Sequence, residues 1–150
     1  MAKKTFAIAF VVAWMLADHA VAQSCLLESA WQNQSGSTLY LEDIDSEGKI
    51  TGLYINRAAG FSCQNTPYPL TGWVLENTNT ISLTVKWENT SDNCHSLTSW
   101  TGFFSSDCQT MSTLWQLVVN GTTSTKQIYQ GSDNFTRVAQ KKSDALQKKE

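Results

Sequence analysis

Histidine is scarce in this chain. Its 150 residues contain two, His19 and His95. The sequence also has no Cys-x-x-Cys pair, no paired acidic motif and no Gly-x-Ser-x-Gly nucleophile elbow. Zinc sites need clustered Cys and His ligands, and catalytic sites need a nucleophile or acid–base pair at a workable spacing. These absences argue against a metal site and against an enzyme.

Basic clusters are also missing from most of the chain. From Gln23 onward there are nine Lys and Arg against twelve Asp and Glu, a net charge of −3. With no basic stripe, nucleic acid is not an expected partner. The one cationic cluster lies among the last dozen residues. We expect this polar segment, residues 139–150, to be a solvated, disordered tail.

No apolar run reaches the ~20 residues that a membrane-spanning helix needs. The longest, Phe6–Ala17, follows Lys3 and Lys4 and precedes the small-residue site Ala20-Val21-Ala22. This layout predicts a secretory signal peptide over residues 1–22, hence a secreted, extracellular protein with no membrane partner. An uncleaved N-terminal anchor is the alternative.

Cysteines and glycosylation sequons both agree with secretion. Four cysteines follow the signal peptide: Cys25, Cys63, Cys94 and Cys108. An even count in a small secreted domain indicates two disulfides, with three pairings open. Four Asn-x-Ser/Thr sequons begin at Asn33, Asn89, Asn120 and Asn134. Asn89 and Asn120 lie in turn-like sequence and are the better acceptors.

Helical periodicity is weak, and residues 23–138 instead consist of short runs rich in Thr, Tyr, Trp and Val. Such runs, punctuated by Gly and Asn turns, predict strands. Eight are expected, over residues 25–32, 38–44, 49–56, 69–76, 80–87, 97–104, 111–120 and 125–138. Eight strands with short connections favour an all-β, antiparallel up-and-down β-barrel, with room inside for side chains or one small ligand.

Tryptophan is dense: five remain after the signal peptide. Trp87, Trp100 and Trp115 fall in three successive predicted strands. They could fill the core, because aromatic side chains bury a large apolar area, or they could line the mouth of the barrel.

Seven short motifs in order resemble the avidin and streptavidin family. They are Trp31-x-Asn33-x-x-Gly36-Ser37, Gly48-x-x-Thr51-Gly52-x-Tyr54, Pro69-Leu70-x-Gly72, Thr84-Val85-x-Trp87, Thr98-x-Trp100-Thr101-Gly102, Leu114-Trp115-x-Leu117 and Gly131-x-Asp133-x-Phe135-Thr136-x-Val138. The resemblance covers Cys25 to about Val138. It implies an eight-stranded barrel that binds biotin, usually as a homotetramer.

The resemblance also implies a ligand set. Asn33, Ser37 and Tyr54 match the three donors to the ureido oxygen of biotin. Asp133 matches the acceptor of one ureido N–H, and Asn56 stands where a small hydroxyl residue accepts the other. Thr98 matches the hydroxyl near the thioether sulfur, and Ser96 one at the carboxylate end. Trp87, Trp100, Trp115 and Leu117 match the cage around the rings and the valeryl chain.

Two departures from the family lie around the mouth. Thr125 stands where a lid Trp usually reaches a neighbouring subunit's ligand, and the loop 57–68 places Phe61 where small polar residues are usual. The resemblance implies Cys25–Cys108, which leaves Cys63–Cys94 to tie two loops over the site. Asn33 is both a sequon and a ligand residue, so we expect it to carry no glycan.

The leading hypothesis is therefore a secreted, non-catalytic protein that binds biotin tightly and sequesters it. The missing lid Trp and the altered loop favour the alternative, a barrel that serves assembly and binds biotin weakly or not at all. A lipocalin-like carrier is a further alternative that the ordered motifs disfavour.

Overall fold

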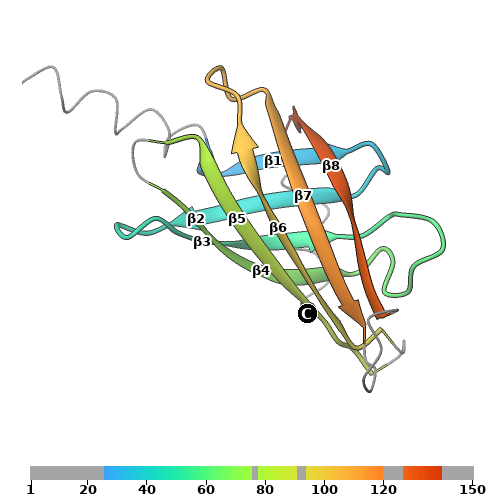
Figure 1. Ribbon diagram of the computed structural model, residues 1–150. Coiled ribbons are helices and arrows are strands. Elements are labelled where there is room, and N and C mark those ends of the chain that lie inside the picture. Colours follow the sequence, from blue (N-terminus) through green and yellow to red (C-terminus); the bar gives the residue numbers. More distant parts are fainter. Residues whose placement is uncertain (1–25, 76–77, 91–93, 120–126, 140–150) are drawn as a thin grey trace, which may run out of the picture.

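The computed structural model describes residues 26–75, 78–90, 94–119 and 127–139. Within these residues the chain forms eight strands: β1 Ser29–Asn33, β2 Thr38–Ile44, β3 Lys49–Ile55, β4 Pro67–Val74, β5 Thr80–Trp87, β6 Ser96–Phe104, β7 Thr110–Val119 and β8 Ile128–Val138. Each pairs antiparallel with the next, and β8 pairs with β1 to close the barrel (Figure 1). The predicted fold class is confirmed. No helix among these residues is long and apolar enough to cross a membrane.

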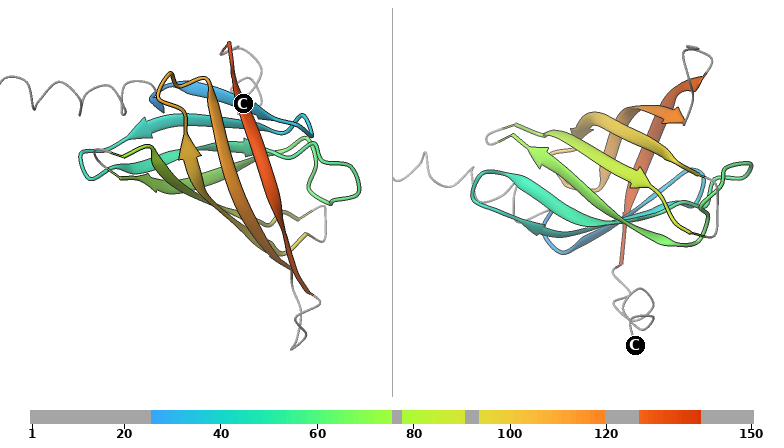
Figure 2. Two further views of the ribbon diagram at one scale, coloured as in Figure 1. Left: turned by 45° about the horizontal axis from the view of Figure 1, so that its top comes forward. Right: turned by 90° about the horizontal axis from the view of Figure 1, so that it is seen from below.

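Because consecutive strands run in opposite directions, the connections lie alternately at one end of the barrel and at the other. One end carries the β1–β2, β3–β4, β5–β6 and β7–β8 connections, and the other carries the remaining three. In Figures 1 and 2 the β3–β4 loop, residues 56–66, projects beyond the strands at the first end. This end, called the open end below, holds the cavity described in the next section.

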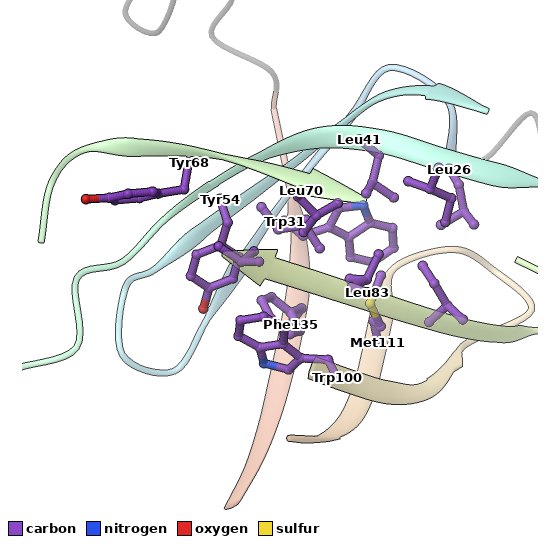
Figure 3. Packing of buried hydrophobic residues seen from close by; sticks show 14 of the residues in the cluster. Leu26, Trp31, Leu41, Tyr54, Tyr68, Leu70, Leu83, Trp100, Met111 and Phe135 are labelled. Carbon is purple, nitrogen blue, oxygen red and sulfur yellow. The ribbon is translucent and has the colours of Figure 1, made fainter. Parts of the chain in front are cut away.

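Alternating burial explains why these runs form a barrel. Along β4 and β5 nearly every second side chain is buried, because neighbouring residues of a strand point to opposite faces. The buried side chains pack inside the barrel (Figure 3). Trp31, Phe104 and Phe135 are the largest of those that are fully buried. Trp31 is thus a core residue, and its indole Nε1 donates to Ser29 Oγ at 2.8 Å.

The hairpin between β2 and β3 forms where the sequence predicts it. Asp45 Oδ1 accepts hydrogen bonds from the backbone N–H of Glu47 and Lys49, each at 2.9 Å. Gly48 has φ of 76°, a left-handed conformation that glycine adopts without a steric penalty. Local turn chemistry therefore accounts for the position of this connection.

Several strand boundaries differ from the prediction by one to four residues, and two of these differences have a local explanation. The first strand begins at Ser29 rather than Cys25, because Glu28 takes φ of 48° and the Ser29 hydroxyl bonds back to the Leu26 carbonyl, which makes a turn. Strand β4 begins at Pro67, two residues early. Its ladder with β5 begins only at Leu70, so Pro67 and Pro69 lie where no N–H is required on that side.

Candidate ligand-binding site

A cavity of about 610 Å³ opens at the open end of the barrel. This volume is within the range of pockets that enclose small molecules. All eleven ligand residues expected from the sequence line it: Asn33, Ser37, Tyr54, Asn56, Trp87, Ser96, Thr98, Trp100, Trp115, Leu117 and Asp133. They come from six strands and two connections, so only the closed barrel assembles them.

Three polar side chains from β1, the β1–β2 turn and β3 form the deep part of the cavity. Asn33 Oδ1 accepts the backbone N–H groups of Ser35, at 3.1 Å, and Ser37, at 2.9 Å. Its amide is therefore oriented with Nδ2 toward the cavity, 3.4 Å from the Tyr54 hydroxyl. Ser37 Oγ accepts the backbone N–H of Arg57 at 2.9 Å, which fixes its position.

Tyr54 is a hydrogen-bond donor rather than a base. Burial raises the pKa of its phenol well above the ordinary value, and the Asp133 carboxylate raises it further, whereas a hydrogen bond with Ser37 acts in the opposite direction. The hydroxyl consequently keeps its proton throughout the physiological range. Asn33 Nδ2, Ser37 Oγ and the Tyr54 hydroxyl together can serve one ligand oxygen.

Asp133 on β8 supplies a buried acceptor beside these donors. Its carboxylate accepts hydrogen bonds from Asn33 Nδ2 at 3.0 Å, Gln34 Nε2 at 2.8 Å and Trp100 Nε1 at 2.8 Å. It is the only acidic side chain among the described residues that line the cavity. Three donors hold the carboxylate in one orientation, with remaining acceptor capacity for a ligand N–H.

Aromatic rings enclose the rest of the cavity. The Trp100 ring stacks on Tyr54 with centroids 4.9 Å apart, and Trp87 meets Tyr54 edge-on at 5.6 Å. Trp87 Nε1 donates to Thr98 Oγ1 at 2.8 Å, which satisfies the buried indole and leaves the hydroxyl proton of Thr98 free to turn toward a ligand. The sequence left the role of Trp87, Trp100 and Trp115 open, and all three line the cavity.

Trp115 depends on a glycine of the adjacent strand. A Cβ built on Gly131 would lie 2.5 Å from Trp115 Cζ2, closer than any real contact. Gly131 pairs directly with Trp115 across β7 and β8. The absence of a side chain at residue 131 therefore makes room for the indole ring.

A disulfide joins two loops at the rim. Cys63 of the β3–β4 loop is bonded to Cys94 of the β5–β6 loop, with Cα atoms 6.0 Å apart. Phe61, two residues before Cys63, lines the cavity and is 45% exposed. Asn56 holds the start of the same loop, since its Oδ1 accepts the Ala58 N–H at 3.0 Å.

Sequence reasoning missed several cavity residues, among them Gln34, His95 and Tyr129. Gln34 spans from the β1–β2 turn to β8, where it bonds to Asp133 and accepts the Asn134 N–H at 3.0 Å. No sequence signal joins these residues, because they are about a hundred positions apart and meet only when β8 pairs with β1. His95 is adjacent to Ser96, but a single histidine in a loop carries no sequence pattern that indicates a ligand contact.

Several sequence predictions fall on residues outside the described ones. These are the signal peptide, the partner cysteine Cys25, the acceptor Asn120, the substituted lid position Thr125 and the tail beyond residue 139. Cys108 is disulfide-bonded. Asn89 is described: its amide Nδ2 donates to the Tyr68 hydroxyl and to Cys63 Sγ, so it lies under the disulfide-linked loops.

Known proteins share this arrangement. A model of the avidin family matches residues 21–138, which includes all eight strands and the whole cavity. The chain belongs to the avidin family. Members of this family are non-catalytic biotin-binding proteins, and the resemblance read from the sequence is thereby confirmed.

Three avidins illustrate the relationship. Afifavidin of Afifella pfennigii is 47% identical over 115 residues, which are 75% of this chain and 69% of afifavidin. The structure of apo shwanavidin is 53% identical with a TM-score of 0.69, covering 76% of this chain and 97% of shwanavidin. The rhizavidin–biotin complex is 42% identical with a TM-score of 0.66, covering 79% and 98%.

Proposed function

We propose that this avidin binds biotin tightly and non-covalently in the open end of the barrel, and that it sequesters the vitamin outside the cell. The supporting observation is the buried group formed by Asn33, Ser37, Tyr54 and Asp133, three donors beside one carboxylate in a single cavity. Rhizavidin, which shares 42% of its sequence with this chain, has been solved in complex with biotin.

The ureido head of biotin complements this group. Its carbonyl oxygen would accept from Asn33 Nδ2, Ser37 Oγ and the Tyr54 hydroxyl. One ureido N–H would donate to Asp133 and the other to Asn56 Oδ1. Three converging donors in a site sheltered from water polarise the ureido group toward an oxyanion-like form, and hydrogen bonds to developing charge are stronger than neutral ones.

The apolar part of biotin matches the aromatic walls. Trp87, Trp100, Trp115 and Leu117 would enclose the fused rings and the valeryl chain, and the Thr98 hydroxyl would face the thioether sulfur. Ser96, at the rim, would lie near the carboxylate. Burial of apolar surface is worth roughly 25 cal/mol per Å², so this cage would add affinity without adding orientation.

Fluorescence titration tests the proposal. Biotin should quench the tryptophan emission of the wild-type protein, because three indoles line the cavity. Tyr54→Phe should weaken binding by about ten-fold or more, since it removes one donor and leaves the ligand oxygen short of a partner. Tyr40→Phe, on the outer face of β2, is the matched control. Absence of quenching at millimolar biotin would contradict the proposal.

Assembly is a second candidate role, favoured by the outer face of the barrel. Leu97, Val118 and Ile128 form one cross-strand row on β6, β7 and β8, and each is about half exposed. An exposed apolar row of this kind marks a contact surface. We propose a homotetramer, as the family resemblance implies. Retention on biotin resin would distinguish a binding protein from a module that only assembles.

Secretion completes the proposal. A signal peptide over residues 1–22, a Cys25–Cys108 bond and an N-glycan at Asn120 would all follow from export, whereas a glycan at Asn89 would displace the hydrogen bonds that its Nδ2 donates to Tyr68 and Cys63. N-terminal sequencing should find Gln23 first, and peptide mapping should join Cys25 to Cys108. Intact mass should show no glycan on Asn33, because a sugar there would fill the cavity.

A further inference from the structure

One basic side chain stands at the mouth of the cavity. Among the described residues that line it, His95 is the only one that can carry a positive charge. The only acidic one, Asp133, is buried at the other end with 6% exposure, whereas the His95 side chain is 49% exposed. The cavity thus has a buried acceptor at its deep end and a titratable cation at its entrance.

An acidic side chain lies beside His95. His95 Nδ1 lies 3.9 Å from Glu88 Oε1, and Glu88 is itself ion-paired with Lys86. The Lys86 ammonium lowers the pKa of the Glu88 carboxyl, so this carboxylate stays ionised. With Nδ1 toward Glu88, Nε2 is the nitrogen left for another partner. Within the described part of the chain it makes no hydrogen bond.

The carboxylate of biotin belongs at this end of the cavity. If the ureido group occupies the deep polar group, the valeryl chain leads outward. Burying an unpaired carboxylate costs several kcal/mol, which keeps it at the exposed rim. Ser96 carries no charge that could neutralise the carboxylate, and its hydroxyl proton is donated to the Cys94 carbonyl at 2.5 Å.

We propose that His95 binds the carboxylate of biotin through Nε2, so that the site prefers free biotin to neutral biotin amides, and more so when the imidazole is protonated. This inference rests on the proposed function. It deepens it by naming the residue that distinguishes the vitamin from its amide-linked conjugates.

The other described side chains at the rim of the cavity are neither basic nor acidic. The cavity residues of the β3–β4 loop, Ala58, Gly60, Phe61 and Ser62, are uncharged. Val119 at the end of β7 and Tyr129 on β8 also add neither a basic nor a carboxylic side chain. Histidine side chains as a class gain a positive charge as pH falls toward about 5.5, whereas the carboxylate of biotin stays ionised, so the preference should increase at the lower pH.

Dissociation rates test the inference on the secreted full-length protein. Release of biotin and of biotinamide would be measured at about pH 8 and pH 5.5 by chase with excess ligand. The ratio of the biotinamide rate to the biotin rate should rise roughly two- to five-fold at the lower pH, as expected for a partly exposed ion pair. The amide serves as an internal control for every pH effect that does not involve the carboxylate.

Two variants separate charge from packing. In His95→Gln the ratio should be independent of pH. In His95→Lys it should be high at both pH values, because a lysine stays charged. A wild-type ratio that does not change with pH, or a pH response that survives in His95→Gln, would overturn the inference. Failure of both ligands to bind would instead overturn the proposed function.

Discussion

Trp100 Nε1 donates to Asp133 Oδ2 at 2.8 Å, across the barrel interior from β6 to β8. The indole that stacks on Tyr54 is therefore the same group that holds the acceptor carboxylate. The aromatic wall of the cavity and its polar deep end are therefore linked, and a substitution of Trp100 or of Asp133 should affect both parts.

Asp133→Ala should reduce biotin affinity by about ten- to a hundred-fold. It removes the acceptor for a ureido N–H and leaves Trp100 Nε1 and Asn33 Nδ2 without their partner, and a hydrogen bond to a charged group is worth about 1.5–3 kcal/mol. Asp133→Asn should lose less. Competition binding would measure both. Asn134→Ala, whose side chain bonds to Ser112 on the exposed face, is the control and should bind normally.

The raised pKa of Tyr54 predicts a loss of stability in alkali. In the unfolded chain the phenol ionises near pH 10, whereas in the folded barrel it stays neutral. Its contribution is thus fully present below about pH 10 and declines as pH rises beyond it. The melting temperature of the wild type should fall more steeply above pH 10 than that of Tyr54→Phe. Equal slopes would contradict the buried, neutral phenol; Tyr40→Phe should retain the wild-type slope.

Removal of the Cys63–Cys94 disulfide should lower stability and speed biotin release. The bond closes a segment of 31 residues, for which chain entropy gives about 3–4 kcal/mol. A Cys63→Ser, Cys94→Ser double variant should melt at a lower temperature, and its looser rim should hold Phe61 less firmly over the ligand. Phe61→Ala should match its faster release without the loss of melting temperature. Unchanged release in both variants would remove the idea that these loops close the site.

Gly131→Ala should weaken binding more than it weakens the fold. The added methyl would meet the Trp115 ring at 2.5 Å, and overpacking of this kind costs about 1–3 kcal/mol. Since Trp115 stands at the partly exposed end of the barrel, it can shift into the cavity and obstruct the ligand. Calorimetric titration would show the loss, and Gln130→Ala on the outer face should behave as wild type.

Charge on the outer row formed by Leu97, Val118 and Ile128 should dissociate the proposed homotetramer. Val118→Glu places a carboxylate between Leu97 and Ile128, where an apolar interface would bury it unpaired. Light scattering should show a smaller species. Thr71→Glu, on the exposed face of β4 and outside this row, is the control. An unchanged mass for Val118→Glu would show that this row is not the contact surface.

Local patterns carried much of the fold. Short runs rich in Thr, Tyr, Trp and Val, separated by turns such as Asp45–Gly48, were enough to predict eight strands in an antiparallel barrel. The beginning of β1 was missed because the left-handed conformation of Glu28 has no signature in the sequence. Trp31 and Trp100 show the limit for the site: both alternate inward on strands, yet one fills the core and the other lines the cavity.

The features of the site that the sequence did not predict depend on contacts between residues far apart in the chain. Gln34 reaches Asp133 only because β8 pairs with β1, and His95 faces the cavity because a disulfide places its loop at the rim. Neither relationship has a local pattern, so a sequence read alone assigns these residues to turns.

The hydrogen bond between Asn33 and Asp133 joins residues a hundred positions apart, across the seam where the last strand meets the first. A ligand bound to both residues would stabilise the pairing of β1 with β8. Binding of the ligand should therefore slow backbone amide exchange most in β1 and β8. At saturating concentrations the ligand also stabilises the folded state in proportion to the logarithm of the ligand concentration. Affinity for the ligand would therefore depend on closure of the barrel between β8 and β1.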